Sequence, residues 1–188
     1  LFGHWWYEGP LFIEYFIRKA TEEQEQFLVA SPGDFLRLGL PLQIATPCPS
    51  SWGDKGYHEV WLNGSNDWIY RHLHRGGEKM RELAASFPAA EGATKRALNQ
   101  SLRELLLAQA SDWPFIMTAG TMTGYARSRI EDHMIRFNAL YDQIMNGCID
   151  EEWLAQIEAR DNVFPQLDYR VFLPLKDTVP VETGAASY

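Results

Sequence analysis

Three clusters of aromatic residues could do chemistry, because each combines flat rings with small polar neighbours outside the expected buried stripes of helices. The clusters are Gly3-His4-Trp5-Trp6-Tyr7, then Ser50-Ser51-Trp52-Gly53 with Val60-Trp61-Leu62-Asn63, and finally Ser111-Asp112-Trp113-Pro114-Phe115. Such rings can stack on the apolar face of a sugar while the polar neighbours hydrogen-bond its hydroxyls. Taken singly, each cluster also fits a packing anchor between helices, which is the commoner role, so both interpretations stay open.

The other reactive residue types lack a partner at a useful spacing. His72 and His74 are two residues apart on an expected helix, so their rings point about 200° apart and cannot share one metal ion. Ser50 and Ser51 lack the sequence context of a nucleophile elbow, and Cys48 lies between two prolines without an identifiable base. We therefore expect no catalytic residue, metal ion or cofactor here.

Composition narrows the possible partners. The net charge of -8 and the pI near 5.1 argue against nucleic acid, whose phosphates are neutralised by Lys and Arg. The chain shows neither a secretory leader nor an apolar run of about 18 residues, so we expect no membrane span. Two cysteines, Cys48 and Cys148, are too few for a disulfide framework and are expected to be reduced and partly buried. We favour a cytoplasmic location.

Apolar residues recur mainly at helical spacing, which predicts a mainly α fold. Helices are expected over residues 10–20, 32–38, 66–87, 94–110, 122–146 and 150–160, with Gly147 in the C-terminal capping position of the fifth. Residues 27–30 are expected to form a short strand or extended piece, residues 40–64 a loop, and residues 169–173 a strand or extended strap. The chain starts within dense apolar sequence without an initiator Met, so we expect it to be the C-terminal portion of a longer protein.

Together the clusters resemble a known family in the family's own order. Leu1-Phe-Gly-His-Trp-Trp-Tyr-Glu-Gly-Pro10 resembles the fourth conserved region of glycoside hydrolase family 57, especially its 1,4-α-glucan branching enzymes. The resemblance continues through the second and third clusters and through Asn66-Asp-Trp-Ile-Tyr-Arg-His-Leu-His-Arg75. It covers about residues 1–172, and the joint pattern is far more specific than any single piece.

The resemblance implies an architecture and a mechanism. That family has an incomplete (β/α)7 barrel followed by a C-terminal helical domain. Residues 1–40 would then be the last βα portion of the barrel, residues 41–173 the helical bundle domain with the aromatic substrate loop, and residues 174–188 a flexible tail. Its retaining mechanism needs two carboxylates about 5 Å apart. The family's Glu nucleophile and Asp acid/base both fall before this chain, and Glu8 matches neither.

The resemblance also implies which residues contact an α-glucan such as amylose or a glycogen-type polysaccharide. His4, Trp5 and Trp6 would lie beside the acid/base, Trp52 and Trp61 would line the cleft, and Asp112 and Trp113 would contribute from the helical domain. The missing N-terminal barrel of the same chain would be the other partner. A 4-α-glucanotransferase or α-amylase of the same family, and a non-catalytic carbohydrate-binding module, remain as alternatives.

Overall fold

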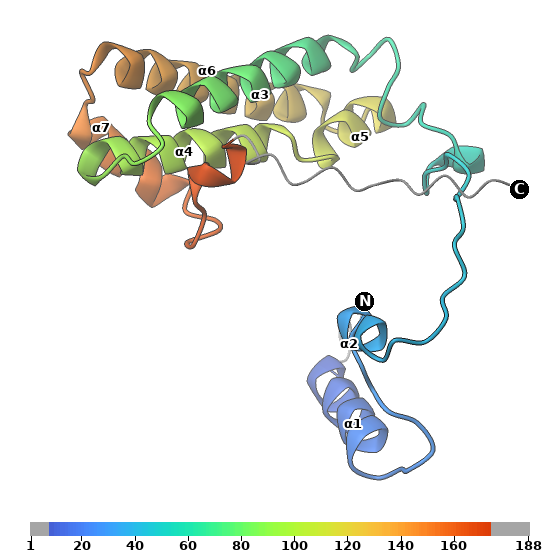
Figure 1. The fold of residues 1–188 in the computed structure, drawn as a ribbon. Helices are drawn as coiled ribbons and strands as arrows, with labels where there is room; N and C mark the ends of the chain where they lie inside the picture. The colour runs from blue at the N-terminus through green and yellow to red at the C-terminus, as the bar shows by residue number, and fades with distance from the viewer. Residues whose placement is uncertain (1–7, 174–188) are drawn as a thin grey trace, which may run out of the picture. The chain divides into compact units, whose positions relative to one another are not determined.

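All regular secondary structure in residues 8–173, the part that the computed structural model describes, is helical (Figure 1). The chain divides into two compact units, residues 1–48 and 49–188. The mainly α fold is therefore confirmed. The expectations for His4, Trp5 and Trp6 and for the tail over residues 174–188 lie outside the described residues.

The first unit contains two helices, α1 (Gly9–Thr21) and α2 (Pro32–Arg37). Each carries a proline in its first turn, where the missing N–H costs nothing. A capping box starts α2, because the Asp34 N–H donates to Ser31 Oγ at 3.1 Å and the Ser31 N–H donates to Asp34 Oδ2 at 3.0 Å. Both helices match the sequence prediction.

Residues 27–30 form no strand, so only the looser alternative of the prediction survives. A strand needs a neighbouring strand to receive its hydrogen bonds, and residues 8–173 offer none. The Gln24 side chain instead organises the turn before this segment. Its Oε1 accepts the Phe27 N–H at 3.0 Å, and its Nε2 donates to the Phe27 carbonyl at 2.9 Å.

The second unit is a helical bundle. It contains a short 3-10 turn, η1 (Asp54–Gly56), and a final one, η2 (Tyr169–Phe172). Between them lie α3 (Trp68–Ser86), α4 (Gly92–Ala108), α5 (Asp112–Ala119), α6 (Thr123–Asn146) and α7 (Glu151–Arg160). The long helices α3, α4 and α6 run side by side (Figure 1). Gly147 ends α6 in the left-handed conformation that the sequence predicted.

The core of the bundle follows the predicted apolar stripes. One cluster packs between α3, α4, α6, α7 and η2, and a second packs between α3, the end of α4, α5 and α6. Gly76 lies where α3 approaches its neighbours most closely, since a Cβ there would meet Leu105 Cδ1 at 2.8 Å and Met134 Cε at 3.3 Å. Glycine therefore permits a helix contact that alanine would obstruct.

The last described segment is a helical turn and not the strand suggested for residues 169–173. Tyr169, the first residue of η2, is fully buried. Its hydroxyl donates to the Phe87 carbonyl at 2.5 Å and accepts the Ala90 N–H at 3.1 Å. Its own N–H donates to Asn99 Oδ1 at 2.9 Å. These bonds pin the segment across the turn between α3 and α4, where a strand would have no partner.

No helix in the described part of the chain combines the length and the apolar character needed to cross a membrane. Cys48 and Cys148 are both free thiols, but both are exposed. The expectation that they are partly buried is wrong, because each lies in a connecting segment outside the apolar clusters.

Candidate functional site

The aromatic loop, residues 49–67, carries the predicted site residues Trp52 and Trp61. Hydrogen bonds of Ser51 hold the backbone of this loop. The Ser51 N–H donates to the Gly56 carbonyl at 2.9 Å, and its hydroxyl donates to the Tyr57 carbonyl and accepts the Gly53 N–H. These bonds close a tight loop around η1. The hydroxyl is thus engaged in holding the backbone, which favours a structural role for this serine.

Trp52, Trp61 and Phe115, here called the aromatic cluster, meet on the second unit. The Trp52 and Trp61 rings lie edge to face with centroids 5.2 Å apart, and the Trp52 and Phe115 rings stack at 6.0 Å with an angle of 29° between their planes. Trp52 is nevertheless 80% exposed. The cluster therefore presents an indole that is held by two other rings and open to solvent.

Gly53 allows Trp61 to pack directly against the loop backbone. A Cβ at this position would lie 2.9 Å from Trp61 Cζ3 and 2.8 Å from the Tyr57 carbonyl oxygen. Because that carbonyl already accepts the Ser51 hydroxyl, it has little freedom to retreat. The glycine of the predicted Ser-Trp-Gly motif therefore sets the position of the second tryptophan.

Asn63, Asn66 and Thr118, here called the amide clasp, tie the aromatic loop to α5. The Thr118 hydroxyl donates to the Val60 carbonyl at 2.6 Å and accepts from Asn63 Nδ2 at 2.8 Å and Asn66 Nδ2 at 3.1 Å. Asn66 is fully buried and also donates to the Pro114 carbonyl at 3.2 Å. Its side chain therefore holds the loop against α5, and α3 begins two residues later, not at residue 66 as predicted.

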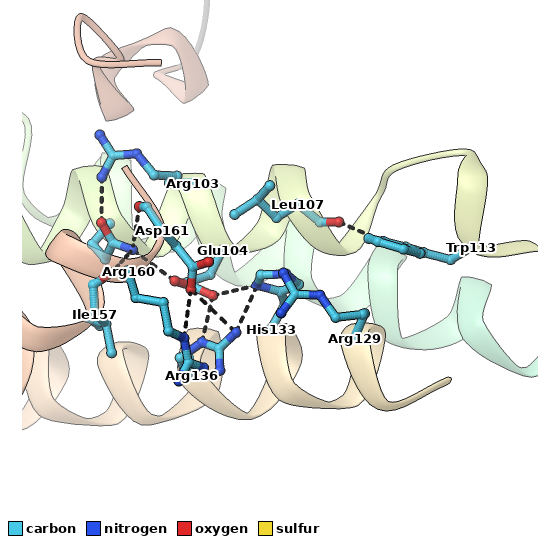
Figure 2. Close-up of polar contacts among 11 residues, drawn as sticks. Arg103, Glu104, Leu107, Trp113, Arg129, His133, Arg136, Ile157, Arg160 and Asp161 are labelled. Carbon is cyan, nitrogen blue, oxygen red and sulfur yellow. Dashed lines mark hydrogen bonds and ion pairs between the residues drawn. The ribbon is translucent and has the colours of Figure 1, made fainter. Parts of the chain in front are cut away.

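The third predicted cluster is divided between the two sides of α5. Trp113 is half-buried; its indole Nε1 donates to the Leu107 carbonyl at 2.8 Å (Figure 2), and its ring lies 6.0 Å from that of Tyr125. Asp112 is exposed in the first turn of the helix, where a carboxylate is favoured by the helix dipole. Of this pair, only Asp112 leaves its polar atoms accessible.

Phe115 belongs to the third predicted cluster but was not among the predicted site residues. A usable signal was present, since residues two apart on a helix point about 200° apart. Once Trp113 faces the helical core, Phe115 must face away from it. The structure thus brings Trp52 and Trp61 together as one site and adds a third ring from a distant helix.

Trp68 offers a useful contrast within the same unit. It lines a groove between α3 and α6 with a volume of about 400 Å³. The Arg127 guanidinium lies over its ring at 5.2 Å, and that guanidinium pairs with Glu131 at 2.8 Å. A cation–π contact of this kind already satisfies the indole. Trp52 lacks such a cover among the contacts of the described residues.

A buried polar network lies inside the bundle, between α4, α6 and the end of α7 (Figure 2). Glu104 Oε2 contacts His133 Nδ1 at 2.7 Å and accepts from Arg136 Nε at 2.9 Å. Arg129 NH2 lies 3.0 Å from His133 Nε2, and Arg136 NH2 lies 3.1 Å from His133 Nδ1. Burial raises the pKa of Glu104, but hydrogen bonds from His133 and Arg136 outweigh it and leave that pKa lowered.

Glu104, His133 and Asp161 bring ligand-type atoms within 4.8 Å of one another. The Arg136 guanidinium, however, already lies among them, with NH2 3.4 Å from Asp161 Oδ2 and Nε on Glu104. A divalent ion would have to displace this fixed positive charge or sit beside it, which Coulomb repulsion disfavours. The network is therefore better explained as ion pairing that joins α4, α6 and the end of α7.

Comparison with known proteins supports one class. Residues 72–172 match the family described as 1,4-alpha-glucan branching enzyme, C-terminal. A 1,4-alpha-glucan branching enzyme of Thermococcus kodakarensis is 31% identical over 174 residues, which are 87% of this chain and 25% of that protein. The fold is that of the C-terminal helical domain of family 57 glycoside hydrolases.

Two solved structures of named enzymes are similar to this chain. The GH57-type branching enzyme of Pyrococcus horikoshii is 32% identical with a TM-score of 0.67, over 95% of this chain and 34% of that one. An alpha-amylase, AmyC, of Thermotoga maritima is 41% identical with a TM-score of 0.63, over 95% and 32%. This chain belongs to the C-terminal domain family of the 1,4-α-glucan branching enzymes. It spans about a quarter to a third of the length of these relatives.

Proposed function

We propose that this chain is the C-terminal part of a retaining 1,4-α-glucan branching enzyme and that its aromatic cluster forms one wall of the glucan cleft. The observation that carries the proposal is the Trp52 indole, which is exposed to solvent yet held by Trp61 and Phe115. A flat apolar face with ordered neighbours suits stacking on a sugar ring. The family to which the chain belongs is that of the 1,4-α-glucan branching enzymes, and a cleft wall of this kind is compatible with their activity.

The chemistry requires groups that this chain does not provide. In a retaining reaction one carboxylate attacks the anomeric carbon while a second carboxylic acid protonates the leaving oxygen. The 6-hydroxyl of another glucan then gives its proton to the second carboxylate, displaces the first from the anomeric carbon and forms an α-1,6 branch. We assign the two carboxylates to the upstream barrel, and we place His4, Trp5 and Trp6 beside the acid/base by resemblance.

The first unit supports the proposal of an upstream barrel. Within residues 8–48 the only buried residue is Gly9, whereas Leu28 is 88% exposed and Ile44 is 96% exposed. Apolar side chains gathered on so small a unit require a partner that covers them. Further chain of the kind that the relatives possess supplies that partner in the proposed enzyme.

Within this framework the tryptophans decide the fate of the covalent intermediate. Rings that hold the acceptor sugar over the intermediate also keep bulk water away, which favours transfer over hydrolysis. Asp112, exposed at the start of α5, is available to hydrogen-bond a sugar hydroxyl. Trp113 would support the same helix from its inner side.

The experiment uses the full-length enzyme with amylose as the substrate. Changing Trp52 or Trp61 to Ala is expected to lower the formation of α-1,6 linkages and to raise the fraction of reducing ends released by water. Trp52→Phe, which keeps a flat ring, should retain most of the branching. An unchanged ratio of transfer to hydrolysis in both alanine variants would contradict the proposed role.

An α-amylase of the same family is the second candidate, and the similarity to AmyC favours its consideration. Product analysis with the unmodified full-length enzyme separates the possibilities. New α-1,6 linkages select branching, shortened chains select an amylase, and redistributed linear chains select a 4-α-glucanotransferase. A natural start codon just before Leu1 would instead select a free-standing carbohydrate-binding module.

We also propose that the enzyme works in the cytoplasm on glycogen-type glucan. The two free, exposed thiols, Cys48 and Cys148, are compatible with a reducing compartment. Cell fractionation with detection of the full-length protein tests the location. Recovery of the protein outside the cytoplasmic fraction would overturn it.

A further inference from the structure

We propose that α5 is the platform that orients the glucan-binding tryptophans, with Phe115 as the positioning residue for Trp52. This inference rests on the proposed function and adds a residue through which that function is controlled. The proposal starts from Trp52 itself. The hydrogen bonds of the Ser51 hydroxyl fix the loop backbone. The Trp52 ring, however, extends into solvent, where it could adopt several rotamers.

Two ring contacts select one orientation. The Trp61 ring meets the indole edge to face at an angle of 68° between their planes, and the Phe115 ring stacks against part of one face of the indole at 29°. The other face can then receive a sugar without first paying for the ordering of a mobile side chain, a cost that otherwise weakens binding. Phe115 is itself 40% exposed, so its ring is divided between Trp52 and solvent.

The helix that carries Phe115 is firmly held. Pro114 and Met117 are buried, and the Met117 side chain belongs to the second apolar cluster. The Trp113 indole N–H is bonded to the end of α4 on the opposite side. The Phe115 ring therefore has a fixed position on α5, whereas a ring on another loop residue would be less firmly held.

The amide clasp links the loop to the same helix one turn after Phe115. Through the Thr118 hydroxyl, the Val60 carbonyl and both asparagine amides meet α5 at one point. The loop segment that bears Trp61 is thus placed by Thr118, while the ring of Trp52 is placed by Phe115. Both parts of the wall consequently take their position from α5.

The test measures amylose kinetics and products of the full-length enzyme. Phe115→Ala should raise KM roughly three- to tenfold, the range expected from one aromatic pair, with little change in kcat for total cleavage. It should also raise the hydrolytic fraction in the same direction as Trp52→Ala. Phe115→Tyr should restore both values, because it keeps the stacked ring.

A double variant distinguishes action through Trp52 from an independent effect. If Phe115 acts by orienting the indole, Phe115→Ala adds nothing to the KM of the Trp52→Ala enzyme. Additive effects, or a Phe115→Ala enzyme with normal KM and product ratio, would overturn the inference. A Trp52→Ala enzyme that behaves like the parent would instead refute the proposed function on which the inference depends.

Substitutions of Thr118 provide a second, independent test of the proposal. Thr118→Val keeps the shape of the side chain but leaves the Val60 carbonyl and two amides without their shared partner, so KM should rise. Thr118→Ser keeps the hydroxyl and should match the parent enzyme. Equal KM values for the two variants would count against the platform. Thermal melting of each variant verifies that the bundle remains folded.

Discussion

Residues 8–48 and residues 49–173 contain similar kinds of helix but differ in what covers them. The apolar residues of α3, α4 and α6 pack into two shared clusters, whereas those of α1 and α2 remain exposed. Local signals such as the capping box of α2 are as good as any in the second unit. The difference shows that a well-formed helix end specifies where a helix lies, while burial decides whether a unit is stable alone.

The largest expected effect comes from separating the two units. Residues 49–188 expressed alone should fold, because both apolar clusters lie inside them. Residues 1–48 alone should show no cooperative transition, since the described part of that unit, residues 8–48, buries almost nothing. Circular dichroism during thermal unfolding measures both. A cooperative transition of the shorter piece would break the comparison.

Arg136→Met should produce the next largest effect within the second unit. It removes the positive charge between two buried carboxylates and should lower the free energy of unfolding by about 3–5 kcal/mol. Arg127→Met, which removes a surface ion pair on the same helix and a cation–π contact with Trp68 of α3, is the matched control and should cost about 1 kcal/mol. Urea unfolding of both variants measures the difference, and equal losses would show that burial of the network is unimportant.

Two adjacent glycines of α3, Gly76 and Gly77, test how much close packing contributes to stability. Gly76→Ala forces a Cβ against Leu105 and should destabilise the chain by about 1–3 kcal/mol. Gly77→Ala meets nothing within 4 Å and should stabilise the helix by about 0.5–1 kcal/mol. Urea unfolding should therefore give opposite signs for neighbouring substitutions. The same sign for both would contradict the close approach of α3.

The smallest effect concerns acid stability. The pKa of Glu104 is lowered from 4.5 in the folded state, so its stabilisation is complete above that pH and is lost as the pH falls through the folded value. Comparing the parent with Glu104→Gln in urea at several pH values isolates this contribution. The gap in stability should narrow below pH 4.5, and a gap independent of pH would contradict the charged state of Glu104.

Much of the bundle could be predicted because long helices repeat one pattern. The predicted starts of α6 and α7 each differ from the observed start by one residue, and Asp150 is the N-cap of α7. The helix α5 was missed because it is short and contains Pro114, which is tolerated only in a first turn. Its few apolar residues give no clear period.

The site was harder to predict than the helices. Sequence order identified Trp52 and Trp61 as members of one region, but not their contact, because loop geometry depends on distant groups such as Thr118. Phe115 required knowledge of which way Trp113 faces. The selection of Asp112 and Trp113 as substrate contacts stays a prediction.

The contacts of Tyr169 bear on how the domain is made during synthesis. The two backbone groups that its hydroxyl satisfies lie 79 and 82 residues earlier in the sequence. Contacts between such distant residues form late, because the intervening chain must first be produced and ordered. We expect the Phe87 carbonyl and the Ala90 N–H, in the turn between α3 and α4, to lack this hydrogen-bond partner until the ribosome has released nearly the whole domain.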